Sequence, residues 1–188
     1  LNISQIDSRQ QAKLKLENGF KDLKTRLNKN EKNNLDSVLP MIGYLLNIKY
    51  EDIRFKLKPD ELLTHLQTAI RFFLEATSVK ANQVNKPLVV IWEDLHWADE
   101  LSTDTINFLM QTLNLEKRRE NRKLHQFLFI LLYRPEYKLP EEIGYKTDLK
   151  KIVLKPLQDP DTDNLITSMA GKKDLSERVK LEDRKSVV

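Results

Sequence analysis

The chain has 188 residues, of which 40% are hydrophobic and 32% charged, with only four glycines and seven prolines. This composition excludes fibrous and disordered chains and favours a helix-rich globular domain. The sequence contains no cysteine, which excludes disulfides, thiolate metal sites and cysteine nucleophiles and fits a cytoplasmic protein.

The charge pattern favours a mixed, solvated surface over a nucleic-acid patch. The net charge is +4, but basic residues alternate with acidic ones, as in residues 116–120. Nucleic-acid backbones are bound by clustered cations, so we expect no nucleic-acid contacts from these residues. The longest apolar run, residues 127–133, is far shorter than the roughly 20 residues of a membrane span. We therefore expect no membrane contact.

Three helices are predicted before residue 83. Residues 6–28 have apolar side chains at the spacing of one helical face: Leu16, Phe20, Leu23 and Leu27. A coiled-coil arm is the alternative, and the segment is too short to separate it from a core helix. Residues 35–47 form a shorter apolar helix in which Gly43 is unfavourable.

The third helix is predicted to begin at Pro59 and to end near residue 82. Proline suits the first helical turn, and Asp60 and Glu61 place negative charge at the positive end of the helix dipole. Residues 1–86 are thus expected to be mainly helical.

The hydrophobic pattern changes at residue 88. Residues 88–92 form a continuous apolar run, which predicts a parallel strand buried on both faces. A helix is predicted at 100–117, followed by a second apolar run at 127–133 and a weaker third at 151–155. Because strand, helix and strand at this spacing form a βαβ unit, the expected fold class is α/β, with parallel strands near 87–93, 127–133 and 151–155. Short helices are expected at 160–170 and 173–180.

Two carboxylates, Glu93 and Asp94, directly follow the first predicted strand. Ligands bind at the carboxyl ends of the strands in an open α/β sheet. Paired acids there can hold a hydrated Mg²⁺ and orient a water, as phosphoanhydride hydrolysis requires. The alternative is that both acids only end a strand and begin a loop, because this pattern is common.

The longer string from Pro87 to Asp99, PLVVIWEDLHWAD, resembles the Walker B segment of STAND-class signalling ATPases, which are relatives of the AAA+ proteins. It looks most like the branch found in bacterial multidomain regulators, including those fused to adenylate or guanylate cyclase domains or to LuxR-type DNA-binding domains. Residues 127–136 resemble the next strand of that family, with its sensor arginine, and residues 152–163 resemble the strand and helix that follow. The resemblance covers residues 35–180 and is strong from 87 to 170.

The resemblance implies a partial P-loop ATPase fold with ATP and Mg²⁺ as ligands. Glu93 takes the position of the Mg²⁺-linked acid, and Asp94 that of the second acid, which polarises the attacking water. The family varies at both positions, so their division of labour stays open. Arg134 takes the position of the sensor that contacts the γ-phosphate. The alternative for Arg134 is an exposed side chain paired with Glu136.

The residues after the acids are predicted to build a loop. His96 could be considered a metal ligand, but neither His65 nor His125 has ligand spacing to it. We expect His96 to position the loop, Trp97 to pack the loop against the core, and Asp99 to cap the helix that starts at residue 100.

The sequence contains no G-x-x-x-x-G-K-[ST] loop, and its glycines stand apart at positions 19, 43, 144 and 171. That loop holds the phosphates in P-loop ATPases, so the acids alone should give little nucleotide affinity. In the resembling family it lies upstream of the acids, and we expect it in a segment before residue 1. Residues 1–182 are expected to be a single partial ATPase domain that continues into further domains, and residues 183–188 to be a non-native tail.

The implied function is a regulatory ATPase module in which nucleotide binding and hydrolysis switch a larger signalling protein. Its expected partners are the nucleotide, the upstream phosphate-loop segment and the downstream domains, and an oligomer is compatible with this function. The alternative is a catalytically inactive scaffold that uses the helical first half to bind partners. A DNA-binding regulator would require a recognition helix, and the sequence shows none in these residues. The motifs of zinc proteases and serine hydrolases are also absent from the sequence.

Overall fold

The computed structural model describes residues 3–4, 6–82, 86–115, 126–141, 143 and 149–170. The elements in chain order are α1 (Arg9–Lys24), α2 (Lys29–Leu45), a 3-10 helix (Ile53–Lys56), α3 (Pro59–Asn82), β1 (Leu88–Trp92), a 3-10 helix (Leu95–Trp97), α4 (Glu100–Leu115), β2 (Phe127–Leu131) and α5 (Asp159–Ala170). The chain divides into two compact units, residues 1–149 and 150–188. The single domain expected for residues 1–182 stays a prediction. None of the described helices has the length and apolar character needed to cross a membrane.

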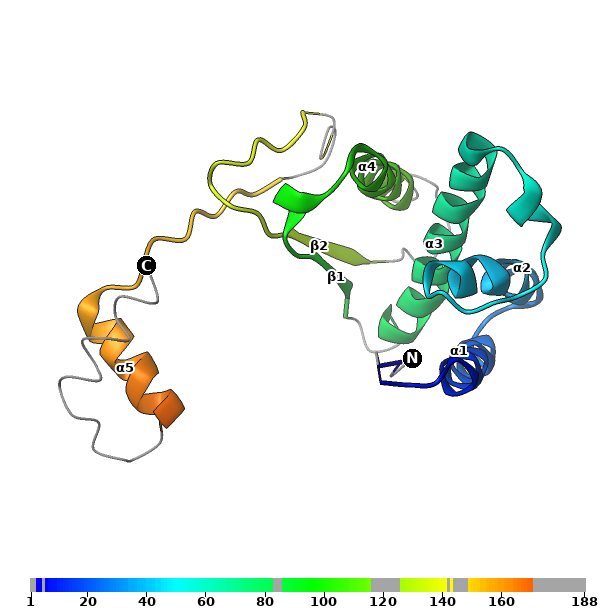
Figure 1. Cartoon of the computed structure of the whole chain (residues 1–188), viewed down its shortest axis with the longest axis horizontal. Helices are drawn as coiled ribbons and strands as arrows, with labels where there is room; N and C mark the ends of the chain where they lie inside the picture. The colour runs from blue at the N-terminus through cyan, green and yellow to red at the C-terminus, as the bar shows by residue number, and fades with distance from the viewer. Residues whose placement is uncertain are drawn as a thin grey trace. The chain divides into compact units, whose positions relative to one another are not determined.

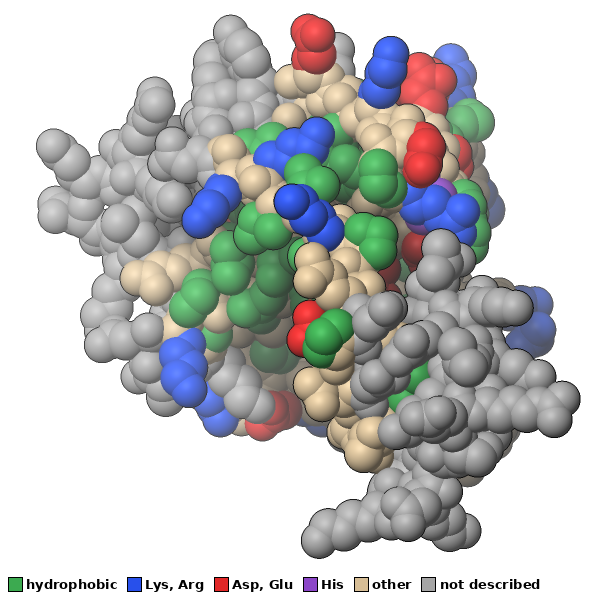
Figure 2. Space-filling model, turned by 90° about the vertical axis from the view of Figure 1, so that its left-hand side faces the viewer, with side chains coloured by type: hydrophobic (Ala, Val, Ile, Leu, Met, Phe, Trp, Pro, Cys, Tyr) green, Lys and Arg blue, Asp and Glu red, His purple; other side chains and the backbone are tan. Residues whose placement is uncertain are grey.

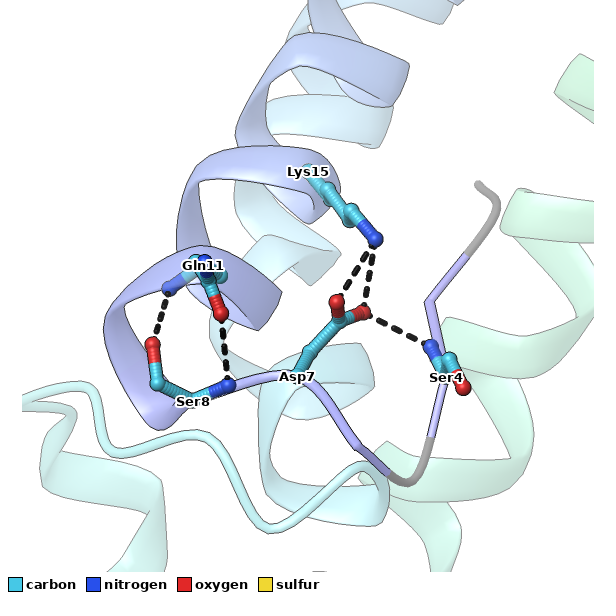
Figure 3. Close-up of polar contacts among 5 residues, drawn as sticks. All are labelled: Ser4, Asp7, Ser8, Gln11 and Lys15. Carbon is cyan, nitrogen blue, oxygen red and sulfur yellow. Dashed lines mark hydrogen bonds and ion pairs between the residues drawn. The ribbon is translucent and has the colours of Figure 1, made fainter.

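The start of α1 is fixed by a capping box (Figure 3). Ser8 Oγ accepts a hydrogen bond from the Gln11 amide at 3.3 Å, and Gln11 Oε1 accepts one from the Ser8 amide at 2.9 Å. The carboxylate of Asp7 accepts hydrogen bonds from Lys15 Nζ at 2.7 Å and from the Ser4 amide at 2.8 Å. The Lys15 hydrogen bond is the main cause that lowers the pKa of Asp7 below its ordinary value of 3.8.

The helical first part of the chain is confirmed. Helix α3 contacts α1 and α2, and it also contacts α4 and β1 (Figure 1). The apolar face predicted for the first helix is buried in this core, at Leu16, Phe20, Leu23 and Leu27. Phe20 stacks on Phe73 of α3, with ring centroids 5.6 Å apart. The first helix is therefore a core helix and not a projecting arm.

Helix α2 begins at Lys29, before the predicted residue 35. Asn28 caps it, because Asn28 Oδ1 accepts from the Glu31 amide at 3.0 Å and Glu31 Oε2 accepts from the Asn28 amide at 2.9 Å. The first turns of α2 carry mainly polar side chains, so apolar periodicity located only the later part of the helix.

Gly43 lies inside α2 because the ring of Tyr50 packs against its backbone. A Cβ added at Gly43 would lie 2.5 Å from both Cδ2 and Cε2 of Tyr50. The chain returns to this position through Asn47, at φ 55°, and through the Ile48 amide, which donates to the Gly43 carbonyl at 2.8 Å. Close packing of Tyr50 thus explains why a glycine, which is unfavourable inside a helix, occupies this position.

The predicted strand, helix and strand form one parallel unit. β1 and β2 pair in parallel from Leu88↔Phe127 to Trp92↔Leu131, and α4 connects them. One face of α4 is buried, at Ile106, Leu109, Met110 and Leu113. The observed fold is thus a mixed α/β fold with a two-stranded parallel sheet.

The prediction that the strands are buried on both faces is wrong for the described residues. Trp92 and Phe129 pack with Ile106 and Met110 of α4. Alternate side chains on the opposite face are exposed, with Val89 at 46%, Ile91 at 52% and Leu128 at 48%. Figure 2 shows an area of the surface where hydrophobic side chains gather with Lys and Arg side chains around it. The open face arises because α4 covers only one side of the sheet and no other described element covers the second.

The second unit contains α5, which confirms the helix predicted at 160–170. The third strand predicted near 151–155 is wrong, because residues 150–158 form neither helix nor strand. Ile152, Val153 and Leu154 are 72%, 67% and 82% exposed. A strand needs a partner backbone for its N–H and C=O groups, and the described part of this unit contains no strand that could pair with residues 151–155. The helix predicted at 173–180 and the tail at 183–188 lie outside the described residues.

Candidate functional site

The two predicted site segments run side by side beyond the ends of the strands. The last pair of the sheet is Trp92↔Leu131. The Leu132 amide then donates to the Trp92 carbonyl at 2.8 Å, and the Leu95 amide donates to the Leu132 carbonyl at 3.0 Å. These two bonds hold residues 93–95 beside residues 132–134. Glu93, Asp94 and Arg134 therefore belong to segments that leave the sheet at the same edge, as expected for parallel strands.

Both acids are exposed at this edge. Asp94 has a left-handed backbone, with φ 55° and ψ 38°, and its side chain is 61% exposed. Aspartate tolerates this conformation better than most residues. Neither Glu93 nor Asp94 forms an ion pair with a Lys or Arg of the described residues. Both carboxylates are therefore available to a ligand.

Arg134 lies three residues beyond the end of β2, in a turn closed by the Tyr137 amide donating to the Arg134 carbonyl at 3.0 Å. Its side chain is exposed. Within the described ranges, Arg134 and Glu136 do not form the ion pair that was the alternative to a sensor role. The guanidinium is thus also available to an anionic ligand.

The residue that anchors the loop is Leu95, so the expected packing of Trp97 against the core is wrong. Leu95 is 4% exposed and packs in the cluster that contains Ile106 and Met110 of α4. Trp97 is 73% exposed, and its ring contacts the imidazole of His96 with centroids 4.9 Å apart. In a 3-10 helix of three residues, successive side chains point in directions about 120° apart, so Leu95 and Trp97 do not both face the core. The sequence signal that could have identified Leu95 as the buried residue is that an apolar side chain directly follows the two acids.

Asp99 caps α4, as predicted. Its Oδ1 accepts a hydrogen bond from the Ser102 amide at 2.8 Å, and its carbonyl accepts one from the Thr103 amide at 3.0 Å. The side-chain hydrogen bond with Ser102 is the main cause that lowers the pKa of Asp99 below 3.8. The loop from Glu93 to Ala98 is therefore fixed at one end by β1, at the other by a capped helix, and between them by Leu95.

His96 also lies in this loop, with its side chain only 12% exposed. Its Nε2 is 3.9 Å from Asp94 Oδ1. In the described part of the chain, no group of three or more His, Asp or Glu side chains is arranged to hold a metal ion. His96 is therefore not part of a metal cage built from described residues.

The donors at the sheet edge fit one kind of metal binding. Mg²⁺ keeps several waters and is bound through one or two carboxylates together with substrate phosphates. The exposed carboxylates of Glu93 and Asp94, which form no ion pair with a described Lys or Arg, suit this mode, and these two residues would hold the ion.

A separate hollow of about 370 Å³ lies along α4, lined by Glu100, Thr103, Asp104, Asn107, Pro140 and Ile143. Its lining includes neither the acid pair nor Arg134, so it is not the predicted site.

Comparisons of the chain with protein-family models, curated proteins and solved structures returned no match. The assignment of a function therefore depends on the residues at the sheet edge and on the resemblance of residues 87–99.

Proposed function

We propose that this chain is the Walker B and sensor part of an ATP-hydrolysing switch in a larger signal-transduction protein. The observation that supports this function best is the hydrogen-bonded extension of the sheet. It brings the segment of Glu93 and Asp94 beside the segment that leads to Arg134. Two available carboxylates and one available guanidinium at one sheet edge match the needs of phosphoryl transfer, which are charge neutralisation and positioning.

In the proposed reaction, a water oxygen bonds to the γ-phosphorus of ATP and the bond from that phosphorus to the ADP oxygen breaks. ADP leaves, and the protons of the water go to the released inorganic phosphate and to solvent. Glu93 and Asp94 would hold a hydrated Mg²⁺, which would supply positive charge to neutralise the phosphates. The Asp94 carboxylate accepts a hydrogen bond from the attacking water and orients it. The Arg134 guanidinium donates hydrogen bonds to γ-phosphate oxygens, which carry charge in the transition state.

This function requires a phosphate-binding loop that the 188 residues do not contain. Backbone amides and a lysine of such a loop supply most of the contacts with the β- and γ-phosphates. We therefore expect the 188 residues alone to bind MgATP weakly. A protein extended upstream through the expected loop should bind MgATP much more tightly.

The first experiment compares MgATP binding by the 188-residue chain and by the upstream-extended protein, using calorimetry. Weak binding by the first and tight binding by the second is the expected result. Tight binding by the 188 residues alone would contradict the requirement for the loop.

The second experiment measures ATP turnover by the extended protein and three variants. Glu93→Gln and Asp94→Asn should each lower kcat by about 100-fold or more, as expected for groups that act on the reacting atoms. Glu136→Gln, an exposed acid on the neighbouring segment, is the control and should keep normal turnover.

A catalytically inactive scaffold remains the second candidate. It is favoured by the exposed apolar face at Val89, Ile91 and Leu128, since such faces suit protein contacts. Normal signalling and unchanged nucleotide turnover in both acid variants would support the scaffold and end the ATPase proposal.

A further inference from the structure

His96 has a largely enclosed imidazole with no hydrogen-bond partner among the described residues. Its side chain is only 12% exposed. Both ring nitrogens, Nδ1 and Nε2, are shielded from solvent, and neither has a hydrogen-bond partner within the part of the chain that the structure describes. Buried polar groups are nearly always paired, because an unpaired one loses its contacts with water and gains nothing in return. We therefore expect the His96 imidazole to have a hydrogen-bond partner.

The nearest acid is Asp94, whose Oδ1 lies 3.9 Å from His96 Nε2. This distance is about 1 Å longer than a hydrogen bond between nitrogen and oxygen. The two side chains differ in freedom, since that of Asp94 is 61% exposed and that of His96 is enclosed. The ring of Trp97 contacts the imidazole at a tilt of 52°, with centroids 4.9 Å apart. A small rotation of the Asp94 side chain is thus the movement that closes the gap.

We propose that His96 is a positioning residue that holds the Asp94 carboxylate through a hydrogen bond from Nε2–H to Oδ1. The catalytic role of His96 rests on the proposed ATPase function, whereas its contact with Asp94 is independent of that function. The bond satisfies the buried imidazole and leaves Oδ2 of Asp94 directed to a ligand.

The backbone of the loop supports this arrangement. The left-handed conformation of Asp94 starts the 3-10 helix, in which the Trp97 amide donates to the Asp94 carbonyl at 2.9 Å. Leu95, buried at 4% exposure, fixes that helix to the core. The imidazole is therefore held by the fold, and it can order a carboxylate that would otherwise sample several rotamers. Second-layer partners of this kind typically change activity or metal affinity by about 10- to 100-fold when removed.

The contact is tested by NMR of the 188-residue chain labelled with ¹⁵N in its histidine rings. Spectra are recorded above the ordinary imidazole pKa of about 6.5, where the tautomer can be read from the two ring nitrogens. The proposal predicts that the proton is on Nε2 of His96 and that Asp94→Gly shifts both ring signals. Glycine keeps the left-handed backbone without strain, so this variant removes the acceptor and preserves the loop.

Glu93→Ala is the matched control, because it removes the neighbouring exposed acid and should leave the His96 signals unchanged. The signals of the other two histidines should not move in either variant. Unchanged His96 signals in Asp94→Gly would overturn the proposal, as would an equal shift in Glu93→Ala.

The role in turnover is tested in the upstream-extended protein. His96→Ala should lower kcat about 10- to 100-fold at saturating Mg²⁺ and ATP, because the Asp94 carboxylate that it positions orients the attacking water. His96→Gln, whose amide can donate from nearly the position of Nε2, should restore part of the loss. Full activity of His96→Ala, or a loss that appears only in KM, would contradict the positioning role. If the wild-type protein hydrolyses no ATP, the catalytic role fails with the proposed function, and the NMR comparison still decides the contact with Asp94.

Discussion

Truncation of Leu95 should destabilise the protein far more than truncation of its larger neighbour Trp97. Leu95 is 4% exposed and Trp97 is 73% exposed. Leu95→Ala removes three buried carbon atoms, which at about 0.8 kcal/mol each amounts to about 2.4 kcal/mol of lost burial. The cavity left behind adds to this cost, while relaxation of the short 3-10 helix reduces it. We expect a loss of about 2 to 4 kcal/mol for Leu95→Ala and about 0.5 kcal/mol or less for Trp97→Ala.

The assay is urea unfolding followed by far-ultraviolet circular dichroism, which does not depend on the tryptophan that one variant removes. With a slope of about 2 kcal/mol per molar urea, the Leu95→Ala midpoint should fall by about 1 to 2 M. The Trp97→Ala midpoint should stay close to that of the wild type.

An equal or larger loss of stability in Trp97→Ala would refute this reasoning. It would mean that the indole packs against the core, as the sequence suggested, and that the acid loop is anchored differently from the observed structure.

Three further predictions concern the helical core. Gly43→Ala should destabilise by about 1 to 3 kcal/mol because its Cβ would overlap the Tyr50 ring. In a Tyr50→Ala background most of this loss should disappear, because only the Ile48 carbonyl oxygen, at 3.3 Å, then remains close to the Cβ; urea midpoints test both. Burial and then Glu17 raise the pKa of Tyr50 from 10.0 to about 12. The protonated Tyr50 phenol should therefore contribute fully to the free energy of unfolding below pH 10, and this contribution should be lost as the pH rises towards 12. An absorbance titration of Glu17→Gln should show a lower phenol pKa than in the wild type. Because the pKa of Asp7 is lowered from 3.8, the Asp7 carboxylate should contribute to folding stability above that pH and lose this contribution below it. Asp7→Asn should therefore reduce the fall in melting temperature at acid pH.

The sequence predicted the elements whose signals are local. Helices α1 and α3 followed from apolar periodicity, and β1 from its continuous apolar run. Asp99 was identified as a cap because an acid stood directly before a helical pattern, and its hydrogen bond with the Ser102 amide confirms this. Each of these features depends on residues within a few positions of one another, so the pattern carried enough information.

The features that failed depend on distant partners. Residues 151–155 have strand propensity, but a strand requires a neighbouring backbone, and the described part of their unit supplies none. Val89 and Ile91 were expected to be buried, and they are exposed because no described element covers their face of the sheet. The sequence also showed no sign of the left-handed backbone of Asp94, or of the burial of Leu95 in place of Trp97. The sequence thus predicts a site at Glu93, Asp94 and Arg134, but it did not predict the geometry of the loop.

The central claim is that the acid pair and Arg134 act together on one metal-bound triphosphate. Paramagnetic broadening of backbone amide signals by Mn²⁺–ATP, measured on the ¹⁵N-labelled 188-residue chain, tests this most directly because it detects weak binding. The account predicts that the amides of residues 93–95 and 133–134 broaden together, and that the double variant Glu93→Ala and Asp94→Ala abolishes the effect at both segments. Broadening spread over other surface carboxylates, or confined to the acid segment without Arg134, would contradict the claim.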